Sequence, residues 1–171
     1  MTPRPPATSP AGLRRRATRC LALVALALAP GFAAAVVEPG APLPAVHLDD
    51  QHGQPLGVPA DTRLVLFAAD KAGSDLVAAA LGSEAPGLLA SRQAVYLADI
   101  SAMPALVTRL FALPALRALP FRVGLARDAA SLAELPRERG AVTLLRLSDG
   151  RLDGVDYLRD TARIRAALGL P

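Results

Sequence analysis

The chain of 171 residues contains little of the chemistry that most enzymes use: one cysteine, one lysine, two histidines and no tryptophan. A single cysteine cannot form an internal disulfide, so a small disulfide-stapled fold is excluded. Because 52% of the residues are apolar and 20% are charged, the chain is neither disordered nor collagen-like. Its length suits one domain with a sizeable core.

An excess of positive charge is also absent once the first 35 residues are set aside. That segment has no acidic residue and holds five arginines: Arg4, Arg14, Arg15, Arg16 and Arg19. Removing these five from the 19 basic residues leaves 14 against 15 acidic residues. A nucleic-acid-binding protein needs a basic face that neutralises phosphates. We therefore expect no nucleic-acid partner.

Residues 1–35 have the order of a secretory signal peptide: arginines, the ten-residue apolar run 20–29, and the small residues 33–35. The run is about half of the roughly 20 residues that cross a bilayer as a helix. We expect cleavage near Val36, a bacterial periplasmic or secreted protein, and no membrane insertion after cleavage. An uncleaved anchor extended to Val37 is the alternative.

Export would leave the mature chain without a thiol. Cys20 stands at the start of the apolar run and follows Arg19, whereas a lipoprotein cysteine comes after small residues at the end of such a run. Met103 is then the only sulfur-containing residue of the mature chain.

Strands and helices alternate after a proline-rich lead-in at residues 36–44, which predicts one α/β domain over residues 45–171. A β-hairpin opens this domain, and an Asp-Gly turn at 149–150 predicts a second one near its end. The alternation favours a central mixed sheet with parallel pairs, an antiparallel edge and flanking helices. Expected strands are 45–49 (as an edge strand), 55–59, 63–69, 94–98, 121–125, 142–147 and 152–158; expected helices are 73–82, 104–111, 129–138 and 161–168.

The helix expected at 104–111 carries an apolar stripe of Leu106, Val107, Leu110 and Phe111. Such a stripe ordinarily faces the core of a domain, and we expect it to do so here. A partner-binding face is the alternative interpretation.

The chain resembles the thioredoxin-like superfamily, and within it the secreted peroxiredoxin-like and cytochrome-maturation-like branch. Three segments carry the resemblance: the opening hairpin 48–56, the strand, loop and helix start at 64–76, and the segment 140–150. The order of elements is similar over residues 40–169. The resemblance implies a thioredoxin-like fold with its site at the start of the helix after residue 70.

The thiol chemistry of that superfamily requires a cysteine thiolate. By resemblance, Ala72 and Asp75 occupy the two cysteine positions, Leu66 that of the buried carboxylate and Val142 that of the cis-proline, and Thr143 alone is retained. The sequence therefore predicts a chain that is neither a thiol-disulfide oxidoreductase nor a peroxidase.

The degenerate site loop consists of Lys71, Ala72, Gly73, Ser74 and Asp75, facing Val142 and Thr143. Lys71, Ser74 and Asp75 are the first candidates for an enzyme with non-thiol chemistry, because a serine nucleophile needs a nearby base. A simpler interpretation makes Ser74 and Asp75 the N-cap and first-turn residues of a helix, and Lys71 a solvated loop charge.

No cofactor or metal is expected. The glycine-rich phosphate cradles of nucleotide-binding proteins are absent from the sequence. The histidines, His47 and His52, flank Asp49 and Asp50 on the predicted hairpin, but His52 lies beyond its turn, so a common metal site is not expected.

Two hypotheses of function follow. The first is a redox-inactive periplasmic domain that binds a protein or peptide in the groove beside residues 71–75 and 141–143. The alternative is an enzyme with non-thiol chemistry or a bound cofactor, such as a flavin-associated oxidoreductase.

Overall fold

The computed structural model describes residues 36–171, so the predicted signal peptide lies outside the described residues. Their elements, in chain order, are β1 (Leu48–Asp50), β2 (Pro55–Leu56), β3 (Leu64–Ala68), α1 (Lys71–Leu81), α2 (Leu88–Ser91), β4 (Ala94–Asp99), α3 (Ala105–Val107), the π-helix η1 (Thr108–Ala112), α4 (Leu113–Arg117), β5 (Val123–Ala126), the 3₁₀-helix η2 (Ala129–Leu132), β6 (Val142–Ser148), β7 (Arg151–Leu158) and α5 (Thr161–Ala167). No helix among them is both long enough and apolar enough to span a membrane.

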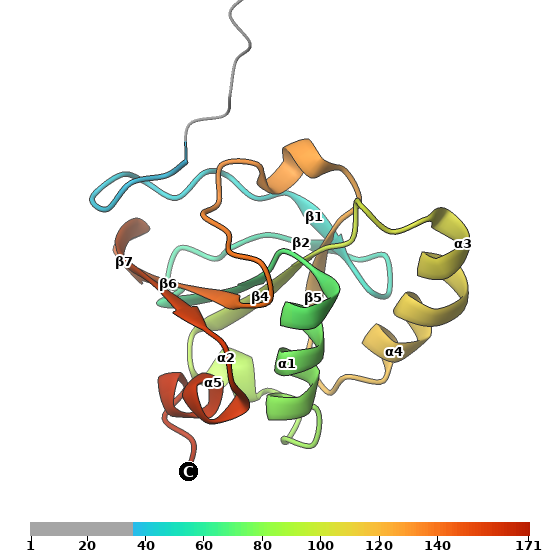
Figure 1. The fold of residues 1–171 in the computed structure, drawn as a ribbon. Coiled ribbons are helices and arrows are strands. Elements are labelled where there is room, and N and C mark those ends of the chain that lie inside the picture. Colours follow the sequence, from blue (N-terminus) through green and yellow to red (C-terminus); the bar gives the residue numbers. More distant parts are fainter. Residues whose placement is uncertain (1–35) are drawn as a thin grey trace, which may run out of the picture. The chain divides into compact units, whose positions relative to one another are not determined.

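Seven strands form one mixed sheet in the order β2-β1-β5-β4-β3-β6-β7 (Figure 1). The central strands β3, β4 and β5 are parallel. The hairpin β6–β7 joins β3 on one side, and the hairpin β1–β2 joins β5 on the other, both antiparallel. This arrangement confirms the predicted α/β fold with parallel pairs, an antiparallel edge and flanking helices. β1 itself is not an edge strand, because β2 lies outside it.

Each face of the sheet has its own apolar core. Alternate residues of β3 point to opposite faces, so Leu66 packs with the residues of α1 and α5, whereas Val65 and Phe67 pack on the other side. That second core is closed by Leu132, Leu135, Val46 and the lead-in residues Val37 and Leu43. Near-continuous burial of the central strands follows from this two-sided cover.

The turn between β6 and β7 forms as its sequence predicts. Asp149 and Gly150 both have positive φ, 50° and 73°, as a two-residue hairpin turn of this kind requires. Glycine adopts this conformation without a steric penalty, and aspartate tolerates it better than most residues. The local sequence is therefore sufficient to place this hairpin.

The predicted helix at 129–138 is largely wrong: only a 3₁₀ turn at Ala129–Leu132 forms, capped by Asp128 through the amide of Ala130. Leu132 and Leu135 are buried, so this segment covers the sheet as an irregular loop. Pro136 lacks an N–H group, and prolines disfavour a helical conformation in the preceding residue. The local sequence therefore ends the helix early.

The helix predicted at 104–111 starts after Pro104 and runs on through α3, η1 and α4 to Arg117. Pro114 lies inside this run and has no N–H to donate to the carbonyl of Leu110. At this place the helix widens into a π-turn, in which the amide of Leu113 bonds to the carbonyl of Thr108. A wider turn accommodates the proline ring without ending the helix.

The apolar stripe of this helix does not face the core, which contradicts the sequence expectation. Leu106 and Phe111 are 68% and 69% exposed, and Val107 and Leu110 are also exposed. The opposite side of the helix, with Thr108, Leu113 and Leu116, faces the protein instead.

Candidate functional site

The start of α1 is fixed by Asp70, which follows β3. Its backbone is extended, with φ −151°, and its Oδ1 atom accepts a hydrogen bond of 2.8 Å from the amide of Gly73. Asp70 is therefore the N-cap, and the helix begins at Lys71. The prediction that Ser74 caps the helix was wrong, since Ser74 lies within its first turn.

The same carboxylate joins α1 to the segment before β6. Its Oδ2 atom accepts a hydrogen bond of 2.8 Å from the amide of Gly140. Burial alone would raise the pKa of Asp70, but these backbone hydrogen bonds, with the nearby charge of Arg139, lower it below its usual value of 3.8. Asp70 is thus an ionised link between the two parts of the predicted site, and sequence reasoning missed it.

Close packing reinforces this link. A Cβ atom at Gly73 would lie 2.8 Å from the carbonyl oxygen of Ala141, so the two backbones meet where only glycine fits. Val142 and Thr143 follow inside the sheet and are buried. The structure therefore brings the predicted residues together, but it fills the space between them and leaves Lys71, Ala72 and Asp75 on the surface.

Lys71 and Asp75 form an ion pair one helical turn apart. Their Nζ and Oδ2 atoms are 2.5 Å apart, and the side chains are 75% and 63% exposed. A lysine that acts as a base or nucleophile must be desolvated, and this one is not. The pair is therefore a solvated surface interaction of small energetic weight.

Ser74 is half-buried and lies near Tyr96 of β4. Burial raises the pKa of Tyr96 to about 12, and the charge of Asp75 also raises it, whereas the side chain of Ser74, which approaches the phenol without reaching hydrogen-bond geometry, lowers it. The phenol hydroxyl is buried and makes no hydrogen bond with any described residue, and the same holds for the hydroxyl of Thr143. A tyrosine with this pKa stays protonated at neutral pH and cannot serve Ser74 as a base.

A second polar cluster lies at the carboxyl end of β4, beside this site. The Asp99 carboxylate accepts hydrogen bonds from the amide and hydroxyl of Ser101 and from Arg137, whose Nη1 lies 3.0 Å from Oδ2. The guanidinium of Arg137 also lies 5.3 Å from the ring centroid of Phe67. Sequence reasoning missed this cluster. The available signal was Asp99, a polar residue at the end of a predicted buried strand, because α/β proteins place ligands at the carboxyl ends of their parallel strands.

The histidines lie apart from both clusters. His47 precedes β1 and His52 lies in the turn after it, and both are exposed. Asp50 is buried, where its carboxylate accepts hydrogen bonds from two backbone amides and Arg122. Burial raises the pKa of Asp50, and these bonds outweigh that effect and lower it. Within residues 36–171 no group of three or more possible ligands could hold a metal ion.

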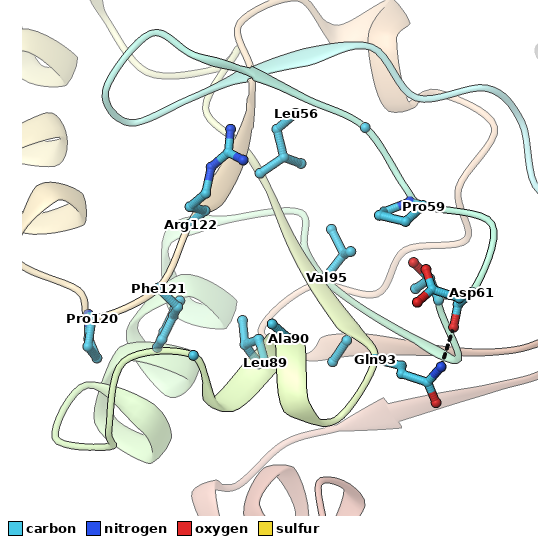
Figure 2. Close-up of a pocket in the computed structure, with 14 residues that line it drawn as sticks. Leu56, Pro59, Asp61, Leu89, Ala90, Gln93, Val95, Pro120, Phe121 and Arg122 are labelled. Carbon is cyan, nitrogen blue, oxygen red and sulfur yellow. Dashed lines mark hydrogen bonds between the residues drawn. The ribbon is translucent and has the colours of Figure 1, made fainter.

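The cavity in Figure 2 lies at the other end of the sheet. It has a volume of about 480 Å³ and is lined mainly by apolar residues around Leu89, Val95 and Phe121, with Arg122 at its side. Its lining comes from the segments before β3, β4 and β5, and Gln93 bonds there to the carbonyl of Asp61. Since α1 starts at the carboxyl end of β3, this cavity is separate from the predicted site.

Comparison with known proteins rests on structure alone. No family model matches the chain, and no curated protein matches its sequence. Among solved structures, a peroxidoxin from Mycobacterium tuberculosis is 17% identical with a TM-score of 0.52, over 78% of this chain and 95% of its own. The thioredoxin domain of a thiol-disulfide oxidoreductase from Bacteroides vulgatus is 11% identical with a TM-score of 0.51, over 79% of this chain and 99% of its own. At these identities the comparisons show a thioredoxin-like fold and nothing finer.

Proposed function

We propose that this protein is an exported, redox-inactive thioredoxin-like domain that binds an extended segment of a periplasmic partner beside the start of α1. One observation carries the proposal: the thioredoxin-like fold is present, while none of residues 36–171 is a cysteine. The resemblance noted in the sequence implies that Ala72 and Asp75 stand at the two cysteine positions. The only cysteine, Cys20, belongs to the predicted signal peptide. Binding without thiol chemistry uses the fold and needs no sulfur.

The polar residues at this surface have local structural partners. The carboxylate of Asp70 accepts hydrogen bonds from two backbone amides, and Lys71 forms an ion pair with Asp75. Tyr96 cannot act as the activating base of Ser74, because its pKa is about 12 and it stays protonated at neutral pH. This arrangement supports binding over nucleophilic catalysis.

Free backbone groups at the surface support an extended ligand. The amide of Gly140 bonds to Asp70, and that of Ala141 bonds to the carbonyl of Glu138. Arg139 is exposed, and its own N–H and C=O make no hydrogen bond with any described residue. An extended polypeptide can pair with such groups through its backbone, next to the exposed Ala72.

Site-specific photo-crosslinking in the native host tests this assignment. A photoreactive residue at Ala72 is expected to yield a reproducible adduct with a polypeptide. The matched control is Ala79, which is exposed on the same helix two turns further along. Equal labelling from both positions, or no adduct from Ala72, would refute a binding surface at the start of α1.

The absence of redox chemistry is tested on the purified uncleaved chain, residues 1–171, and its Cys20→Ser variant. Both are expected to show no insulin reduction and no peroxide consumption. Turnover by the original chain that is lost in the variant would refute redox inactivity. A stoichiometric chromophore in the absorption spectrum would instead favour the cofactor-bearing enzyme.

A further inference from the structure

The helical segment 105–117 lies at the side of the molecule away from α2 and α5 (Figure 1). It presents an apolar face to solvent. Leu106, Leu110 and Phe111 are each more than half exposed, and Val107 is 43% exposed. Soluble proteins seldom leave four large apolar side chains together on one surface without an interaction that covers them.

The tertiary structure holds this face outward. Thr108 is buried on the opposite side of the helix, and Leu113 and Leu116 pack against the core. The helix cannot turn its apolar face inward without exposing these residues.

Positive charge lies beside the apolar face. Residues 100–127 contain four arginines and no acidic residue. Arg122 is paired with Asp50, whereas Arg109, Arg117 and Arg127 form no ion pair with any described residue. These three line one open cavity of about 670 Å³ together with Thr108 and Leu113, so the cavity adjoins the apolar face and is not part of it. Arg109 follows Leu106 by three positions, which makes the two side chains neighbours at the border of the helix.

The nearby carboxylates do not neutralise this cavity. The oxygens of Asp99 accept hydrogen bonds from Ser101 and Arg137, and Asp128 caps η2. Arg117 donates through Nε to the carbonyl of Gln51, so its remaining N–H groups and the guanidinium groups of Arg109 and Arg127 are available to an external anion.

We infer that the apolar face, defined by Leu106, Val107, Leu110 and Phe111, adsorbs to an anionic phospholipid bilayer with the help of the three arginines beside it. This inference is independent of the polypeptide-binding proposal. The apolar side chains enter the boundary between headgroups and acyl chains, and the arginines contact lipid phosphates, as a basic amphipathic helix does at a membrane surface. The domain lies on the bilayer and does not span it.

Charge argues against a second copy of the chain as the occupant. A symmetric dimer through this face would bring two sets of three arginines together, and like charges at an interface disfavour association. An anionic surface instead gains from all three arginines at once, and phospholipids supply both the anion and the apolar phase.

Vesicle co-sedimentation of the purified protein tests the inference. We expect binding to vesicles of phosphatidylcholine and phosphatidylglycerol at 3:1, much weaker binding to phosphatidylcholine alone, and release as NaCl is raised. Arg109→Gln with Arg127→Gln should lower the partition coefficient about 30-fold, since each arginine near an anionic surface is worth about fivefold. Leu106→Gln and Phe111→Gln should each lower it about tenfold.

Control variants carry the same changes elsewhere on the surface. Arg92→Gln removes an exposed arginine outside this face, and Tyr157→Gln removes an exposed aromatic residue of β7, so both should bind vesicles like the original chain. All substituted residues are exposed, and circular dichroism checks that each variant is folded.

Three results would overturn the inference. They are no sedimentation with anionic vesicles, binding to neutral vesicles as strong as to anionic ones, or a loss of vesicle binding in the control variants as large as in the test variants. Sedimentation velocity tests the competing occupant, which is a second copy of the chain. A dimer that Phe111→Gln dissociates, without vesicle binding, would assign the face to self-association instead.

Discussion

Asp70 gives the sharpest test of how the candidate site is held together. Its carboxylate caps α1 through Gly73 and also binds the amide of Gly140, so Asp70→Ala removes two interactions at once. Loss of an N-cap costs about 1 kcal/mol. Loss of a charged hydrogen bond to a backbone amide costs about 1.5 to 3 kcal/mol. We expect Asp70→Ala to lower the free energy of unfolding by about 3 kcal/mol.

Asp160 provides a matched control, because it caps α5 through one hydrogen bond of 2.8 Å, to the amide of Arg163. Asp160→Ala should cost only the cap, about 1 kcal/mol. The difference between the two variants isolates the bond from Asp70 to Gly140. Urea denaturation followed by circular dichroism measures both values, with unchanged slopes if the unfolded state is the same.

The effect of Asp70→Ala should also depend on pH. Because the pKa of Asp70 is lower in the folded protein than its usual value of 3.8, the ionised side chain stabilises the fold above that value. This stabilisation is lost as the pH falls through the folded pKa, so the gap between the original chain and the variant should shrink below about pH 4.

Two results would refute this account of Asp70. A difference below about 0.5 kcal/mol between Asp70→Ala and Asp160→Ala would show that the bond to Gly140 adds nothing. A gap between the original chain and Asp70→Ala that stays constant down to pH 2 would show that the ionised form is not what stabilises the fold.

Two further substitutions probe the packing beside Asp70. Gly73→Ala should destabilise the protein by about 1 to 3 kcal/mol, because its Cβ would lie 2.8 Å from the backbone oxygen of Ala141; a stabilised variant in the same urea assay would contradict this contact. Tyr96→Phe should be neutral or stabilising by up to about 1 kcal/mol, because it removes a buried hydroxyl that has no partner among the described residues. Above pH 10 the original chain should lose stability relative to Tyr96→Phe, since the phenol ionises near pH 10 when unfolded and near 12 when folded. A loss of more than 1 kcal/mol at pH 7, or parallel alkaline curves, would contradict the burial of that hydroxyl.

Much of the fold was predictable because its signals are local. The positive-φ residues Asp149 and Gly150 specify the last hairpin, and the continuous apolar run at 64–68 specifies a strand covered on both faces. The start of α1 was predicted two residues late, because a serine and an aspartate at 74–75 also suit a cap. The actual cap, Asp70, also bonds to a residue 70 positions away, which periodicity does not report.

The candidate site was named from the sequence without its contacts. The sequence placed residues 71–75 beside 141–143, and in the structure Gly73 lies against Ala141. The sequence did not predict that the backbone of Ala141 would close against Gly73, or that Asp99, Ser101 and Arg137 would form a cluster nearby, since those residues meet only through tertiary packing.

The sequence by itself determines the available chemistry: with Cys20 as the only cysteine, no folding of residues 36–171 can produce a thiol. Only the tertiary structure decides which side of an amphipathic helix is covered. Leu106 and Phe111 have the spacing of core residues, yet the helix is held by Thr108, Leu113 and Leu116 on its other side. Periodicity shows that a helix has an apolar face, and the position of the sheet beneath it determines whether that face is buried.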